Sequence, residues 1–96
     1  MIGLMRNLAN ELAGDDIRVN AVCPGWVDTP MVDSQAADAG LSREEGAALF
    51  VSDHLIQRLI RPEEITDAVI WLATSKMTTG VALPVDGGLL ARTFSS

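Results

Sequence analysis

The chain has 96 residues, of which 48% are apolar and 21% are charged, and its formal net charge at pH 7 is −6. A chain of this length forms one domain at most, and it buries a smaller share of its surface than a full-sized domain does. Thirteen acidic residues oppose seven basic ones, and the Lys and Arg residues are scattered along the chain. This balance argues against a nucleic-acid-binding surface and against a patch for anionic membranes.

The sequence disfavours several other classes of protein. No uninterrupted apolar run reaches the roughly 18 residues of a transmembrane span, so we expect no membrane partner. The first residues lack the basic segment and the small-residue cleavage site of a signal peptide, which makes a cytoplasmic location the expectation. A single cysteine, Cys23, leaves no internal disulfide framework and no cysteine-based zinc cluster, and we expect no metal site.

In chain order, the first expected element is a helix over residues 2–13. Its apolar residues recur at the spacing of one helix face, namely Met5, Leu8, Ala9 and Leu12. Gly14 is expected to end this helix with a positive φ. Residues 17–23 are short and β-branched and run into Pro24-Gly25, which predicts a strand that ends at a sharp loop.

The second half of the chain predicts more helix and one more strand. Residues 26–60 suggest one or two short helices, one of which begins at a capped start at Ser42. The clearest helix begins at Pro62 and ends near residues 74–75. Its expected buried stripe consists of Ile65, Ala68, Val69 and Leu72, widened by Trp71. Residues 81–85 predict a second strand, closed by a turn at Asp86-Gly87-Gly88.

Two strands separated by helical crossovers predict a parallel pair in an α/β layered fold. Both strands are apolar on both faces, as are strands of a sheet that helices cover on two sides. A parallel strand here delivers a Pro-Gly turn at its carboxyl end, where ligands of open α/β sheets bind. Gly25 permits close approach to the backbone, and Thr29 offers a hydroxyl nearby. The alternative is a plain tight turn without a ligand.

Four segments, in order, resemble the short-chain dehydrogenase/reductase family. Residues 17–31, IRVNAVCPGWVDTPM, match the family pattern I-R-V-N-x-[VI]-x-P-G-x-[VI]-x-T. Residues 61–74, RPEEITDAVIWLAT, are similar to its late helix, and residues 79–88, TGVALPVDGG, to its closing strand. Residues 1–13 resemble the second half of the helix that carries the family's Tyr-x-x-x-Lys pair.

The resemblance implies a partial NAD(P)-binding Rossmann-like domain over residues 1–96, formed by the last two strands of a doubly wound parallel sheet. Residues 30–58 correspond to a helical substrate lid. The cofactor, NAD or NADP, would meet one wall formed by Pro24, Gly25, Val27 and Thr29. In this implied site the Val27 main chain binds the nicotinamide carboxamide, and the Thr29 hydroxyl reaches the carboxamide or the pyrophosphate. Trp26 and Met31 would lie toward a small-molecule substrate.

The chain also departs from the family's pattern. It contains no tyrosine, its only lysine is Lys76 after the late helix, and the glycine-rich phosphate turn is absent. We therefore assign no catalytic residue, place the first residue in mid-helix, and expect no activity from the chain alone. Three interpretations stay open. The chain is a fragment of an oxidoreductase that interconverts a secondary alcohol and a ketone, with a 3-oxoacyl-thioester or alicyclic substrate. Otherwise it is a homo-oligomerisation module that uses the first helix and the late helix with the final strand, or a decayed remnant.

Five other residues could carry chemistry but have simpler explanations. His54 has no acidic or cysteine partner at ligand spacing and is expected at the surface or lining the lid. Cys23, at a strand end, is expected to be a buried small hydrophobe. Gly87-Gly88 is expected to be a turn, because no helix N-terminus is expected after it. Asp86 is expected to form structural hydrogen bonds.

Overall fold

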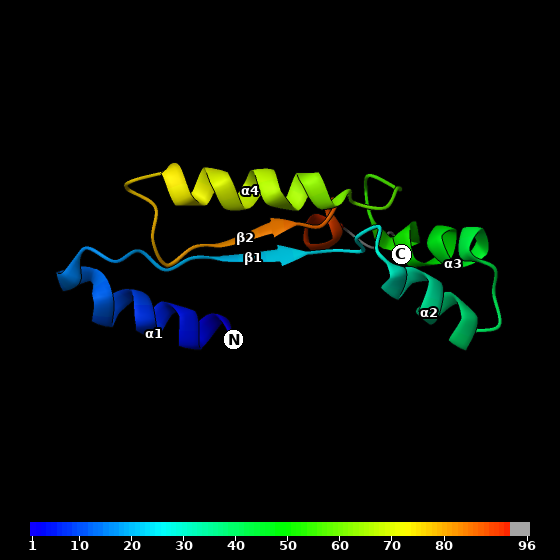
Figure 1. Ribbon diagram of the computed structural model, residues 1–96, viewed down its shortest axis with the longest axis horizontal. Coiled ribbons are helices and arrows are strands. Elements are labelled where there is room, and N and C mark those ends of the chain that lie inside the picture. Colours follow the sequence, from blue (N-terminus) through cyan, green and yellow to red (C-terminus); the bar gives the residue numbers. More distant parts are fainter. Residues whose placement is uncertain (93–96) are drawn as a thin grey trace.

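The computed structural model describes residues 1–92 and has a two-stranded parallel sheet at its centre. Strand β1 (Ala21–Pro24) pairs with β2 (Ala82–Val85), and Ala21 lies opposite Ala82. The predicted parallel pair is therefore confirmed. Helix α4 (Pro62–Thr74) runs along one face of the strands, and α1 (Ile2–Leu12) lies on the opposite side (Figure 1). This is the expected layered α/β arrangement.

Strand β1 begins four residues later than predicted, because side chains replace the backbone ladder before Ala21. The backbone N–H of Val19 donates to Thr79 Oγ1 at 3.1 Å. The Asn20 side chain donates to the Thr78 carbonyl at 2.9 Å and accepts from the Val81 backbone N–H at 3.0 Å. The two segments still run side by side here, joined in part by side-chain hydrogen bonds.

Helix α1 ends differently from the prediction for Gly14. The chain tightens into a short 3₁₀ helix, η1 (Ala13–Asp15), and the residue with positive φ is Asp16, at 58°. Its backbone N–H donates to the Ala13 carbonyl at 3.1 Å. Aspartate tolerates this left-handed conformation better than most residues do. The prediction of a positive φ at Gly14 was wrong.

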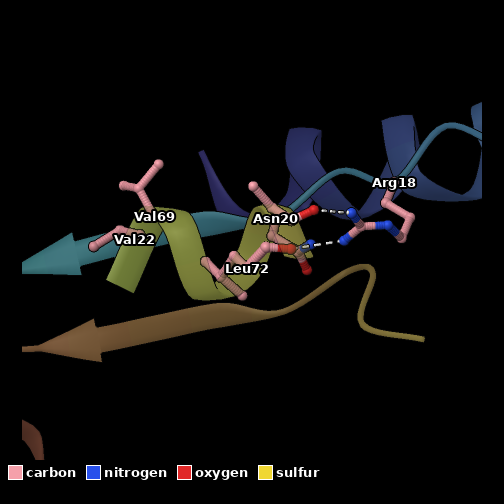
Figure 2. Close-up of a pocket in the computed structure, with 6 residues that line it drawn as sticks. Arg18, Asn20, Val22, Val69 and Leu72 are labelled. Atoms are coloured by element: carbon pink, nitrogen blue, oxygen red, sulfur yellow. Dashed lines mark hydrogen bonds between the residues drawn. The ribbon is translucent and has the colours of Figure 1, made fainter. Parts of the chain in front are cut away.

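Helix α4 is stabilised at both ends by groups that match its dipole. Pro62 occupies the first turn, and the Glu64 carboxylate accepts a hydrogen bond from the Arg61 backbone N–H at 2.8 Å. At the other end, the Arg18 guanidinium donates to the Leu72 and Ala73 carbonyls at 2.7 and 2.6 Å (Figure 2). Arg18 thereby links the start of the first strand segment to the end of α4.

The predicted stripe of α4 is only partly buried. Leu72 is buried, but Val69 is 50% exposed and Trp71 is 54% exposed, so the prediction that these two residues are buried was wrong. The reason is that α4 packs on two strands, and a sheet of two strands is narrower than the apolar stripe. Helix α1 behaves in the same way, since Met5 and Ala9 are buried while Leu8 is not.

Two short helices lie beyond the carboxyl ends of the strands, as expected for residues 26–60. They are α2 (Pro30–Asp38) and α3 (Arg43–Phe50), followed by the 3₁₀ helix η2 (Val51–Asp53). The predicted cap is present: Ser42 Oγ accepts from the Glu45 N–H at 3.2 Å, and Glu45 Oε1 accepts from the Ser42 N–H at 3.1 Å. None of the helices within residues 1–92 is long and apolar enough to cross a membrane.

Candidate functional site

The carboxyl end of β1 opens into a cavity of about 430 Å³. All six residues to which the sequence assigned a cofactor or substrate contact line this cavity: Pro24, Gly25, Trp26, Val27, Thr29 and Met31. The start of α4 closes the far side with Pro62 and Ile65. The structure thus brings the six residues around one space, and that space carries no charged side chain in its lining.

The loop after β1 is held in place by the segment that precedes α4. Val27 and Ile60 form an isolated parallel bridge. The Ile60 N–H donates to the Trp26 carbonyl at 2.9 Å, and the Asp28 N–H donates to the Ile60 carbonyl at 2.8 Å. In a parallel bridge of this kind, the N–H and C=O of the central residue point away from the partner strand. The Val27 backbone N–H has no hydrogen-bond partner within residues 1–92.

Thr29 is the N-cap residue of α2, but its side chain does not cap the helix. Its hydroxyl instead donates to the Val27 carbonyl at 3.4 Å, a long hydrogen bond. A hydroxyl can rotate and can donate and accept at once, so this group can turn toward a ligand in the cavity at little cost.

Trp26 and Met31 differ in how firmly they are held. The Trp26 ring stacks on Phe50 of α3, with ring centroids 4.3 Å apart and an interplanar angle of 14°. Met31 is 64% exposed at the start of α2. Trp26 is therefore a fixed wall of the cavity, and Met31 is an adaptable apolar side chain at its rim.

A family model described as enoyl-(acyl carrier protein) reductase matches residues 1–90. Curated short-chain dehydrogenases match nearly the whole chain, among them fogB of Aspergillus ruber, 45% identical over 92% of this chain. The chain belongs to the short-chain dehydrogenase/reductase family. It spans about a third of the length of the curated relatives that it matches, 32% in the case of fogB, and it corresponds to their C-terminal portion.

Solved short-chain dehydrogenase structures share the fold. The aldohexose dehydrogenase of Thermoplasma acidophilum superposes on 99% of this chain with a TM-score of 0.88 and 37% identity, and 39% of that structure is covered. The structure of ElxO with NADP bound superposes on 95% of this chain with a TM-score of 0.79 and 29% identity, and 36% of it is covered. The expected fold class, the C-terminal part of a Rossmann-like parallel sheet, is confirmed.

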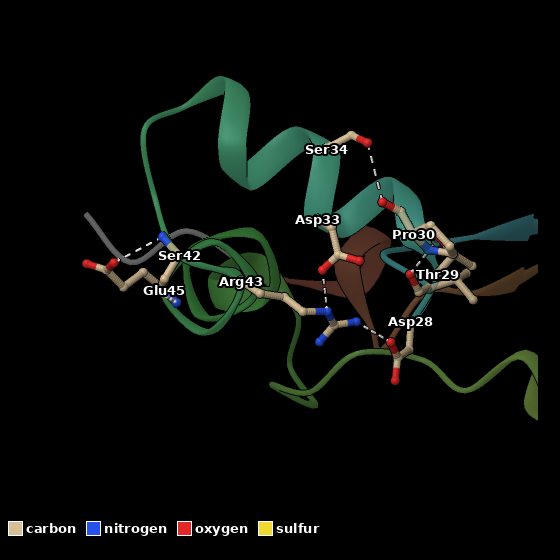
Figure 3. A network of polar contacts seen from close by, with 9 residues as sticks. Asp28, Thr29, Pro30, Asp33, Ser34, Ser42, Arg43 and Glu45 are labelled. Carbon is tan, nitrogen blue, oxygen red and sulfur yellow. Dashed lines mark hydrogen bonds and ion pairs between the residues drawn. The ribbon is translucent and has the colours of Figure 1, made fainter.

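Helices α2 and α3 are tied to the loop after β1 by one arginine. Arg43 on α3 pairs with Asp28 in the loop, and its Nε lies 2.7 Å from Asp33 Oδ1 on α2 (Figure 3). The hydrogen bond to Asp28 raises the pKa of Arg43. All three side chains are exposed, so the pairing orients α2 and α3 more than it stabilises the fold. In the sequence Arg43 was visible only as part of a helix start, because its partners lie 10 and 15 residues away.

The end of β2 forms the expected turn. Gly87 and Gly88 have φ values of 62° and 86°, and Asp86 Oδ1 accepts from the Gly88 N–H at 2.9 Å. Contrary to expectation, a short 3₁₀ helix follows, η3 (Leu89–Ala91). Asp86 Oδ2 accepts from the Leu90 N–H at 3.2 Å, so this carboxylate already occupies the amides that an anion would use. The structural role expected for Asp86 is confirmed.

His54 is only 1% exposed, so of the two positions expected for it the surface one was wrong; its side chain packs against Gly25 and Gly87. Cys23 is half-buried within β1 and carries a free thiol. In the part of the chain that the structure describes, no three His, Cys, Asp or Glu side chains are placed to hold a metal ion.

Proposed function

We propose that the chain is the cofactor-wall and lid portion of an NAD(P)-dependent oxidoreductase that interconverts a secondary alcohol and a ketone. The observation that carries this proposal is the single cavity lined by the six residues that the family resemblance assigned to cofactor and substrate. Family membership and the NADP bound in the ElxO structure support the choice of a nicotinamide dinucleotide. When bound, that dinucleotide supplies the hydride acceptor or donor.

The residues present fit the carboxamide end of such a cofactor. A carboxamide needs one donor and one acceptor side by side. The Val27 N–H and C=O, which both point away from Ile60, offer this pair. Pro24 and Gly25 provide a flat wall without a bulky side chain. The Thr29 hydroxyl, held only by its long bond to the Val27 carbonyl, is available to add a further hydrogen bond.

The proton transfer that accompanies hydride transfer needs a group from elsewhere. The family's acid/base is a Tyr phenol, and these 96 residues contain no tyrosine. The role of the chain is therefore to bind, orient and exclude water. The uncharged cavity lining supports an uncharged, apolar reacting end for the substrate, such as a 3-oxoacyl chain or an alicyclic ring. A cytoplasmic location is part of the same proposal.

A chimera tests this proposal directly. The matching C-terminal portion of the aldohexose dehydrogenase is replaced by this chain, and NAD(P)-dependent oxidation and cofactor affinity are measured. We expect a folded chimera that binds the dinucleotide. Thr29→Val should raise its Kd or KM for the cofactor about 5- to 10-fold, the value of one hydrogen bond. Ser34→Ala on the same lid is the matched control and should change neither. A folded chimera with no dinucleotide affinity would contradict the proposal.

A second candidate function is association with other copies through apolar surface. Val69, Ile70 and Trp71 on α4 are each at least half exposed, and Leu4 on α1 is 62% exposed. Exposed apolar side chains on a helix can mark an interaction site. The predicted homo-oligomer, which would use α1 and α4 with β2, stays a proposal that rests on this exposure.

A further inference from the structure

His54 is a buried polar side chain that the proposed function leaves unused. It follows η2 and begins the extended segment that leads toward α4. Among the fully buried side chains of residues 1–92 it is the largest, with 1% of its surface exposed. A histidine in such a place is usually either satisfied by hydrogen bonds on both nitrogens or replaced by an apolar residue.

The imidazole lies between the backbones at the carboxyl ends of both strands. A Cβ added to Gly25, just after β1, would lie 2.7 Å from His54 Nε2. A Cβ added to Gly87, just after β2, would lie 2.9 Å from His54 Nδ1. One ring therefore fills the space between the two strand ends, and glycine at both positions is what lets it approach.

The two ring nitrogens have different surroundings. The Trp26 backbone N–H donates a long hydrogen bond of 3.5 Å to Nε2, which requires that Nε2 carry no proton. The neutral ring then carries its proton on Nδ1, and Nδ1 is buried without a partner among the described residues. An apolar side chain would fill the same volume without leaving a polar atom unpaired. Packing alone does not account for a histidine here, whereas the contact at Nε2 does.

That contact completes the anchoring of Trp26. Its carbonyl accepts from the Ile60 N–H at 2.9 Å, and its ring stacks on Phe50. The other polar backbone group of Trp26 is its N–H, which donates to His54 Nε2. The segment from His54 to Ile60 therefore holds both polar groups of the Trp26 backbone, immediately before the Val27 peptide.

We infer that His54 is a positioning residue for the cavity wall: its unprotonated Nε2 fixes the Trp26 peptide and thereby the orientation of the Val27 N–H and C=O. The purpose of this role rests on the proposed function of the cavity. The hydrogen bond between the Trp26 N–H and Nε2 does not depend on that function. Its partner is the backbone of the same chain, so it can be measured without cofactor, substrate or activity.

The first test is the tautomer of His54 in the 96-residue chain, read from imidazole ¹⁵N chemical shifts by NMR. We expect the Nδ1–H form with an unprotonated Nε2. Free histidine prefers the opposite tautomer, so a packing role alone would not produce this signature. A proton on Nε2, or the averaged shifts of a free imidazole, would overturn the inference. This measurement needs no variant.

The second test compares two substitutions of matched length. His54→Gln keeps an oxygen that can accept from the Trp26 N–H, and His54→Met removes every acceptor at similar volume. We expect the Trp26 amide to exchange with solvent about 2- to 3-fold faster in the Met variant than in the Gln variant, the lower end of the range for one lost hydrogen bond, because this bond is long. The Ile60 amide is the internal control and should be equally protected in both. Equal Trp26 exchange in the two variants would overturn the inference.

The outcomes separate this inference from the proposed function. If the tautomer and the exchange rates are as expected while the chimera binds no dinucleotide, His54 fixes the wall and the cavity serves another ligand. If the chimera binds and turns over while the tautomer is the opposite one, the function stands and the positioning role of His54 falls.

Discussion

Gly25 brings the backbone at the end of β1 against His54 and the Cα of Asp86. An added Cβ would lie 3.0 Å from that Cα and 2.7 Å from His54 Nε2. The imidazole is buried, so it cannot swing away, and the Asp86 carbonyl accepts from the Leu89 backbone N–H in the turn, which fixes the Asp86 backbone. The close approach at this position is therefore a packing requirement as well as a feature of the cavity wall.

We expect Gly25→Ala to lower the free energy of unfolding by about 1–3 kcal/mol through overpacking. Gly14→Ala is the matched control, because no atom lies within 4 Å of its added Cβ and its φ is not positive. That control should leave stability unchanged or raise it by about 0.4–1 kcal/mol, since alanine restricts the unfolded chain. Urea unfolding of both variants measures the difference. Equal effects would contradict the close packing at Gly25.

At the scale of elements, α2 and α3 are two short helices that local interactions hold in place. Helix α3 has eight residues, too few for a stable helix on its own in water. Its reciprocal cap between Ser42 and Glu45 adds stability that its length does not provide, and the pairing of Arg43 with α2 orients it. Gly46 allows α3 to lie directly against Ala36 of α2.

We expect Ser42→Ala to lower the stability of α3 by about 0.5–2 kcal/mol, because the Glu45 N–H loses its acceptor. Amide exchange within residues 43–50 measures this loss locally. Ser34→Ala on α2 is the control, because the Ser34 hydroxyl makes only a long bond of 3.5 Å to the Pro30 carbonyl (Figure 3). A Ser42 variant with unchanged exchange would show that tertiary contacts alone hold α3.

The N-terminus of α4 carries a carboxylate with a pH-dependent role. Hydrogen bonding from Arg58 and from the Arg61 backbone lowers the pKa of Glu64 from the ordinary 4.5 to about 2. A carboxyl whose pKa is lower in the folded state stabilises the fold above its unfolded pKa. This contribution is present above pH 4.5 and is lost as the pH falls toward 2.

We expect an NMR titration of the Glu64 carboxyl carbon to show this low pKa. Arg58→Ala should move the pKa up toward 4.5, because the first and largest cause of the shift is the hydrogen bond from Arg58. Arg6→Ala, on α1, is the control and should leave the titration unchanged. A Glu64 pKa that stays the same in the Arg58 variant would contradict the bidentate pairing seen at 2.7 and 2.8 Å.

At the scale of the whole molecule, the chain is more extended than a compact domain. Its radius of gyration is 16.3 Å, whereas a compact domain of this length would have about 12.5 Å. Its accessible surface is 6708 Å², against about 5300 Å² for a monomer of this mass. We attribute the additional accessible surface to helix faces that two strands cannot cover. Val69 and Trp71 are exposed on such a face of α4.

We expect the chain to self-associate in solution through this surface, measured by light scattering after size exclusion. Trp71→Asp should shift the population toward monomer, because it puts a charge at the centre of the exposed α4 face. Met77→Asp is the control: Met77 is also exposed but lies in the loop after α4, away from that face. A clean monomer for the unmodified chain would count against the association function.

We also expect the purified chain to show no NAD(P)H-dependent turnover with any ketone. Loss of a general acid/base alone typically lowers the rate about 10²- to 10⁴-fold, and these 96 residues contain no tyrosine to serve as one. A coupled or direct absorbance assay at 340 nm over a panel of aliphatic and alicyclic ketones measures this. Steady turnover that scales with protein concentration would contradict it.

The long helix from Pro62 and the capped helix at Ser42 could be predicted from the sequence, because their signals, periodicity and caps, lie within a few residues of each other. The parallel strand pair followed from the order of strands and helical crossovers, and the six residues around the cavity followed from the family resemblance. The burial of His54, the ion pairs of Arg43 and the exposure of Trp71 became visible only in three dimensions. The burial and the ion pairs depend on partners far along the chain, and the exposure of Trp71 depends on the width of the sheet beneath α4. The periodicity of one segment predicts neither the distant partners nor the width of the sheet.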